Sequence, residues 1–188
     1  MGMRLFRILV LFFTLIATPA QSADDSFLAD LREQVVEVPV RVEGLFGDKV
    51  VNLTATIFRP SGDGPFPLVV LSHGTPPHAA DRVKIGRFRR IPQIRQFINR
   101  GFAVIVPIRR GHGATGGDYA EDKGKCASPL YFEAGRAAGR DIVAVVDYAV
   151  KLPFVRPECV ILVGQSAGGF GSLAAASMNP KGLIAVVN

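Results

Sequence analysis

Polar and apolar residues alternate along two stretches in the first third of the chain, residues 35–42 and 50–58. Alternation with a period of two is typical of strands that bury one face. The turn-forming pair Gly47-Asp48 between them predicts an antiparallel arrangement. Uninterrupted apolar runs, typical of strands that are covered on both faces, follow at residues 68–71, 102–106, 159–163 and 183–187.

Three segments between and after these runs have helical patterns. They are residues 84–99, with a possible break at Pro92, residues 131–151, and the small-residue segment 170–178. The predicted order is therefore β-β-β-α-β-α-β-α-β. Such alternation predicts an α/β fold with a mostly parallel sheet and helices on both faces.

The first residues have the pattern of a secretory signal peptide. Two arginines precede the apolar run 8–16, and small residues with a proline follow at 17–23. This run is shorter than the roughly 20 residues that span a bilayer, although an uncleaved anchor is the alternative. We expect residues 1–23 to be removed. The remaining 24–188 would form one domain without a stable membrane anchor, periplasmic or secreted.

Basic residues outnumber acidic ones by 22 to 16, which gives a net charge of +6. Part of the excess lies between residues 82 and 100. We interpret these charges as the solvated face of the helix predicted at 84–99. A surface for an anionic partner is the alternative. The sequence has no nucleic-acid-binding motif, so no nucleic-acid partner is expected.

The two cysteines, Cys126 and Cys159, leave open whether they pair in an exported protein. No spacing of Cys and His residues is typical of a metal site. The sequence therefore predicts neither a metal nor a cofactor.

Candidate chemistry begins at Gly164-Gln165-Ser166-Ala167-Gly168, which fits G-x-S-x-G. The apolar run 159–163 leads into this motif and the predicted helix 170–178 follows it. A sharp turn between a strand and a helix would expose the Ser166 hydroxyl at the end of the strand. The pattern therefore predicts a nucleophilic serine, with a glycine-rich turn without chemistry as the alternative.

Two further glycine-containing blocks follow predicted strands, namely Ser72-His73-Gly74-Thr75 and the loop from Arg109 to Tyr119. With the Ser166 motif, these blocks make the chain resemble the α/β-hydrolase fold, near the dienelactone hydrolase and prolyl-oligopeptidase-like branches. The resemblance covers about residue 35 to the end. In a parallel sheet, the three loops would open on the same edge.

The resemblance implies cleavage of an ester, lactone or peptide bond through an acyl-Ser166 intermediate. The backbone N–H groups of Ala167 and Thr75 would form the oxyanion hole, and His73 and Gly74 would shape the oxyanion loop. The implied partner is a small-molecule ester or peptide substrate.

The general base is missing from its expected place. The chain's histidines, His73, His78 and His112, all precede Ser166, and no His, Asp or Glu follows it. The resemblance places both acid and base after the serine. We therefore expect an N-terminal portion whose last strands are missing. A catalytically inactive truncated or hydrolase-like binding protein is the alternative.

Most polar residues of the loop after the fourth predicted strand are expected to have surface or structural roles. His112 is the candidate for a substitute base, while Asp118 and Glu121 are expected on the surface. Arg109 and Arg110 are expected to pair with loop acids rather than orient a substrate carboxylate.

Overall fold

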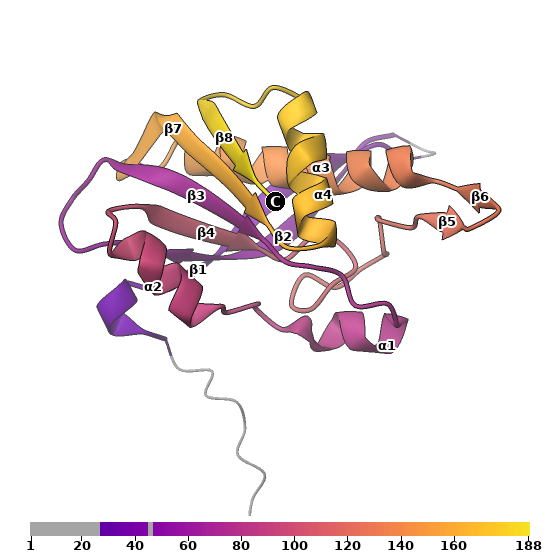
Figure 1. Cartoon of the computed structure of the whole chain (residues 1–188), viewed down its shortest axis with the longest axis horizontal. Coiled ribbons are helices and arrows are strands. Elements are labelled where there is room, and N and C mark those ends of the chain that lie inside the picture. The colour runs from indigo at the N-terminus through magenta and orange to yellow at the C-terminus, as the bar shows by residue number, and fades with distance from the viewer. Residues whose placement is uncertain (1–26, 45–46) are drawn as a thin grey trace, which may run out of the picture.

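The alternating stretches form an antiparallel pair at one edge of a six-stranded sheet (Figure 1). The computed structural model describes residues 27–44 and 47–188. The strands of this sheet are β1 (Gln34–Val42), β2 (Lys49–Phe58), β3 (Phe66–Ser72), β4 (Ala103–Pro107), β7 (Val155–Gly164) and β8 (Leu183–Val187). Their order is β1-β2-β4-β3-β7-β8. The last four are mutually parallel, which confirms the mostly parallel sheet.

Helices cover both faces of this sheet (Figure 1). Helices α3 (Tyr131–Ala149) and α4 (Ala167–Ser177) pack together on one face, and α2 (Ile91–Ile98) lies on the other. The shorter elements are the 3-10 turns η1 (Ala29–Leu31) and η2 (Val83–Ile85), helix α1 (Ala79–Arg82), and a small hairpin of β5 (Gly124–Lys125) and β6 (Ser128–Pro129).

The core lies in two layers, one on each face of the sheet. In β3, Leu68 and Val70 pack beneath α3, whereas Val69 and Leu71 pack beneath α2. Strand side chains alternate between the two faces, so a strand buried on both sides is apolar at every position. Burial of each such side chain stabilises the fold by about 1.5–3 kcal/mol.

The predicted helix at 84–99 is wrong in its first half. Gly86 (φ 61°) and Phe88 (φ 42°) have left-handed backbone conformations, which end helical structure before α2 begins at Ile91. Gly86 accepts a hydrogen bond from the N–H of Ala114, and this contact belongs to the tertiary structure. Pro92 does not break α2, because it lies in the first turn, where a missing N–H has no cost.

The basic segment is also less solvated than predicted. Arg87 and Arg89 are largely buried and both bind the buried Glu33 carboxylate, at 2.9 and 2.7 Å. Arg95 pairs with Asp30, at a more exposed position. These ion pairs attach the η1 segment and Glu33 to α2 and to the region before it.

Two further expectations have different outcomes. Cys126 and Cys159 are both free, so they are not paired in this structure. The predicted signal peptide, residues 1–23, lies outside the described residues and stays a prediction. Within the described ranges, no helix has the length and apolar character needed to span a membrane.

Candidate active site

Ser166 lies in a sharp turn between β7 and α4. Its backbone (φ 55°, ψ −122°) is in a region that residues other than glycine seldom occupy, and its side chain is exposed. Such strain persists only where the surroundings impose it. The helix begins at the next residue, Ala167, whose N–H belongs to the first turn and has no helical acceptor. The local geometry is therefore that of a nucleophile elbow.

Glycines impose this turn through close backbone contacts. A Cβ atom on Gly164 would collide with the backbone of Gly168, and one on Gly168 would collide with the carbonyl oxygen of Ser72. A Cβ atom on Gly74 would lie 3.2 Å from the Gln165 carbonyl oxygen and 3.5 Å from Ser166 Cβ. The elbow and the loop after β3 are thus in direct contact.

Sheet topology brings the three predicted loops together. β3 lies between β4 and β7, and Ser72 at the end of β3 is in register with Gly164 at the end of β7. The Gln165 N–H donates to the Ser72 carbonyl at 3.2 Å, which extends this pairing into the turn. The loops therefore open on one edge, as parallel strands require.

Ser166 lines a cleft of about 630 Å³. Thr75 and Ala167 line the same cleft, so two predicted oxyanion residues and the predicted nucleophile share it. We call this cavity the Ser166 cleft. Its remaining lining residues are Pro76, Pro77, Arg82, Tyr119, Glu121, Asp122, Lys123, Gly124, Tyr131, Ala134, Ala138 and Phe170.

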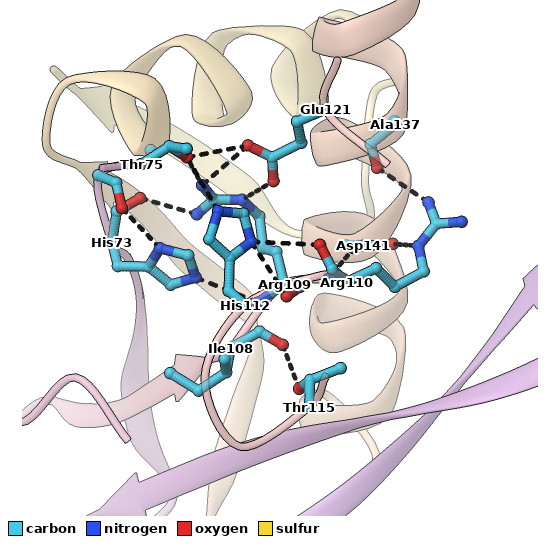
Figure 2. A network of polar contacts seen from close by, with 12 residues as sticks. His73, Thr75, Ile108, Arg109, Arg110, His112, Thr115, Glu121, Ala137 and Asp141 are labelled. Carbon is cyan, nitrogen blue, oxygen red and sulfur yellow. Dashed lines mark hydrogen bonds and ion pairs between the residues drawn. The ribbon is translucent and has the colours of Figure 1, made fainter. Parts of the chain in front are cut away.

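A buried polar network lies behind Thr75 (Figure 2). The Thr75 hydroxyl lies 3.2 Å from Glu121 Oε2, 3.2 Å from His112 Nε2 and 3.4 Å from Arg109 Nη2. Arg109 also donates from Nη1 to the His73 carbonyl oxygen at 2.8 Å. Both ends of the loop from His73 to Thr75 are therefore fastened to residues that follow β4.

Arg109 is fully buried, and Glu121 is 6% exposed. The guanidinium binds the carboxylate through two contacts, Nε to Oε1 and Nη2 to Oε2. Paired charges of this kind satisfy one another, whereas either one alone would be strongly destabilising. The expected pairing of Arg109 with a loop acid is confirmed, but the surface position expected for Glu121 is wrong.

Arg110 fastens the same loop to α3. Its Nε donates to Asp141 Oδ1 at 2.7 Å, and its backbone N–H donates to Asp141 Oδ2 at 3.0 Å. Burial raises the pKa of Asp141, while the neighbouring Arg110 opposes that shift. Arg110 is therefore also a structural residue, and Asp118, as expected, is exposed.

His73 is buried, and both nitrogens of its ring form hydrogen bonds with groups of the protein (Figure 2). Nε2 accepts from the backbone N–H of Arg109 at 3.1 Å, so Nδ1 carries the proton and donates to the Gly74 carbonyl at 2.8 Å. Burial and the nearby Arg109 charge hold the pKa of His73 well below its usual value. His73 is therefore neutral and connects the loop after β3 to Arg109, while its part in an oxyanion loop stays a prediction.

His112 does not reach the Ser166 cleft in the position required of a base. Its Nδ1 faces the carbonyl oxygens of Arg109 and Arg110 at 3.3 and 3.2 Å, and its Nε2 faces Thr75. Burial lowers the pKa of His112, and the nearby Glu121 charge partly opposes this. The suggestion that His112 replaces the base is therefore wrong, because both ring nitrogens are engaged inside the protein.

Residues 47–188 match the X-Pro dipeptidyl-peptidase family, S15. The chain belongs to this family. This membership agrees with the α/β-hydrolase resemblance.

The proteins that this S15 family chain resembles include peptidases and an esterase. Dipeptidyl aminopeptidase BIII of Pseudoxanthomonas mexicana is 29% identical over 119 residues, which are 63% of this chain and 15% of that protein. A post-proline cleaving enzyme of Rickettsia typhi superposes with a TM-score of 0.55 at 20% identity, covering 88% of this chain and 22% of that one. An acetyl xylan esterase of Paenibacillus sp. R4 gives 0.51 at 20% identity, covering 79% and 50%. The solved structures show the fold alone, and the chain spans at most half of these relatives.

Sequence reasoning missed the acid at the centre of the S15 chain's site. Glu121 follows a glycine-rich loop with no periodic pattern around it, so nothing local marks it as buried. Arg109 carried a weak signal, because it follows the wholly buried strand β4 within two residues. Arg82 was assigned to a basic surface, yet it lines the Ser166 cleft.

Proposed function

We propose that this chain carries the nucleophile and oxyanion hole of an exported serine hydrolase that cleaves peptide or ester bonds. The observation that supports this most is the strained Ser166 turn at the Ser166 cleft, beside the loop that ends at Thr75. The dipeptidyl aminopeptidase relative favours a peptide that loses a dipeptide, and the description of the S15 family favours proline as the second residue of that peptide. Lactones and small esters are the other substrates that this chemistry would accept.

The proposed reaction proceeds through a covalent acyl-serine. The Ser166 Oγ forms a bond to the carbonyl carbon as its proton passes to a base, and the carbonyl oxygen becomes negatively charged. The N–H groups of Ala167 and Thr75 would stabilise that oxygen. The C–N or C–O bond then breaks, the leaving group takes a proton, and water hydrolyses the acyl-serine to release Ser166.

The proton acceptor is neither His73 nor His112, because both use their ring nitrogens inside the protein. The proposal therefore has two parts. Ser166 and the N–H groups of Ala167 and Thr75 would supply the nucleophile and the oxyanion hole, and the base has no assigned position. The alternative function, a hydrolase-like binding protein, shares the cleft and lacks the base.

Labelling with a fluorophosphonate tests the nucleophile. Such a probe reacts with a serine that has a base and an oxyanion hole, so one adduct on the chain, detected by intact mass, would show that a base other than His73 and His112 serves Ser166. The adduct should disappear in Ser166→Ala and remain in Ser177→Ala, a matched change at the exposed end of the same helix. An unlabelled wild-type chain would support the binding protein instead, and labelling that survives Ser166→Ala would assign the nucleophile elsewhere.

Export is proposed on the pattern of residues 1–23 alone. Expression in a bacterium, followed by N-terminal sequencing of the periplasmic or secreted protein, should give a start near Asp24. Recovery of an intact Met1 from membranes would instead support an uncleaved anchor.

A further inference from the structure

Arg82 lies on the wall of the Ser166 cleft. Neither the nucleophile elbow nor the predicted oxyanion hole uses its side chain. It forms no ion pair with any acid of the described residues. By contrast, the neighbouring Arg109 and Arg110 bind Glu121 and Asp141. An arginine beside a cleft without an acidic partner has donors available to a ligand.

The position of Arg82 is well defined. Its guanidinium lies 3.9 Å from the centre of the Tyr119 ring, and its backbone carbonyl accepts the Gly113 N–H at 2.9 Å. Tyr119 is held in turn by the edge of the His112 ring, with centres 5.4 Å apart, and by close backbone packing against Gly111. A guanidinium stacked on a fixed ring loses little freedom when it binds a ligand.

Other charges of the cleft leave its Arg82 side positive. Glu121 is paired with the buried Arg109, whereas Asp122 keeps its negative charge while it accepts the N–H of Gly124 at 3.0 Å. Lys123 adds a second cation to the lining. The cleft therefore offers more unpaired positive than negative charge.

Another part of the lining is apolar. Ala134 and Ala138 come from α3, and Phe170 comes from α4, which also begins at the elbow. A ligand that fits the whole cleft would combine an apolar group with a negatively charged one.

We propose that Arg82, stacked on Tyr119, is a specificity-determining residue that binds a carboxylate of the substrate. This inference rests on the proposed function for the position of the scissile bond, and it adds the substrate class: acidic esters or peptides. The carboxylate belongs either to the acyl group or to the leaving group, and both share the chemistry that Arg82 recognises.

Paired esters test the proposal. For the acyl side, the mono-4-nitrophenyl esters of glutarate and adipate are compared with 4-nitrophenyl valerate and hexanoate, which match them in chain length. For the leaving-group side, 4-acetoxybenzoate is compared with its methyl ester. For each pair, kcat/KM of the charged ester is divided by kcat/KM of the neutral ester, after the rate with Ser166→Ala protein has been subtracted. In one of the two comparisons, acyl side or leaving-group side, Arg82→Gln should lower this ratio at least tenfold. Arg82→Lys should lower it less.

Arg90→Gln is the matched control. Arg90 is an exposed arginine beside an aromatic ring, Phe88, and it lies outside the cleft. Its replacement should leave the ratios within twofold of wild type. Ratios in both comparisons that are indifferent to Arg82→Gln would overturn the proposal.

Binding without turnover separates this inference from the proposed function. Dissociation constants of glutaramate and valeramide, and of 4-hydroxybenzoate and its methyl ester, are measured on Ser166→Ala protein by NMR titration. Preference for one acid that is lost in Ser166→Ala/Arg82→Gln supports the inference even if the wild-type chain hydrolyses nothing. Equal affinity for each acid and its neutral partner, together with an absence of turnover, contradicts the inference.

Discussion

The elbow, residues 164–169, and the loop after β4, residues 108–121, both shape the Ser166 cleft, but by different physical means. The elbow is held by backbone atoms so close together that only glycine fits at Gly164 and Gly168. The loop is held by buried charges, Arg109 with Glu121 and Arg110 with Asp141. At Gly164 the steric constraint comes from the nearby Gly168, and at Gly168 it comes from Ser72 in the adjacent strand β3. This constraint acts between uncharged backbone atoms, whereas each charged side chain of the loop needs a partner of opposite charge.

The two regions should therefore fail in different ways. A side chain added at Gly164 or Gly168 should lower the stability of the fold whatever its polarity, since the elbow has no room for it. A change in the loop should be harmful mainly when it leaves one buried charge without its partner, and a second change that removes the partner should restore stability.

The largest effect is expected from separating the buried pair. Glu121→Leu leaves the Arg109 guanidinium unpaired in the interior and should lower the free energy of unfolding by about 3–5 kcal/mol. Arg109→Met/Glu121→Leu should recover much of that loss. Urea denaturation measures both. As a control, Asp30→Asn at the exposed pair with Arg95 should cost no more than about 1 kcal/mol. Equal losses for the buried and exposed pairs would remove the basis of the comparison.

The elbow should respond almost as strongly to a single methyl group. Gly168→Ala places Cβ against the Ser72 carbonyl oxygen, and backbone in β3 cannot move far, so we expect a loss of about 3 kcal/mol. Thermal unfolding by circular dichroism checks this, with Ser177→Ala as the near-neutral change in the same helix. A Gly168→Ala protein as stable as wild type would show that the elbow is not held by sterics.

Thr75→Val tests the connection between the two regions. The change keeps the Thr75 backbone N–H but removes the hydroxyl that contacts Glu121, His112 and Arg109. We expect a loss of about 1–2 kcal/mol in stability. If the network positions the oxyanion hole, kcat on a neutral ester should also fall about tenfold with KM nearly unchanged, and Thr75→Ser should retain kcat. A fall in stability without any change in kcat would limit the network to a structural role.

The smallest effect concerns pH. The pKa of His73 in the folded protein lies well below its usual 6.5, so the unfolded chain takes up that proton first. Stability due to neutral His73 is therefore fully present above about pH 6.5 and is lost as the pH falls below it, by up to about 1.4 kcal/mol per pH unit. His112, with its lowered pKa, acts in the same direction. Urea midpoints at pH 7.5, 6.5 and 5.5 should fall mainly over the second interval, and a constant midpoint would contradict a buried, neutral His73.

Much of the fold was predictable because its signals are local. The double-sided burial of residues 68–71 in β3 and of β4 requires an apolar residue at every position, and the strand at 183–187 coincides with β8. The helix at 84–99 failed because Gly86 and Phe88 adopt left-handed conformations in contact with a loop distant in sequence. A periodic pattern records which face is buried, but not where tertiary contacts interrupt the helix.

By itself, the sequence determined the α/β layering, the strained turn at Ser166 and the neighbourhood of three loops, since hydrophobic period and glycine placement act over short distances. The tertiary structure alone decided that Glu121 is buried with Arg109, that His112 is occupied, and that Arg82 faces the Ser166 cleft. A charged residue has the same local pattern whether solvent or a partner neutralises it, and only the folded chain brings that partner within a few ångströms.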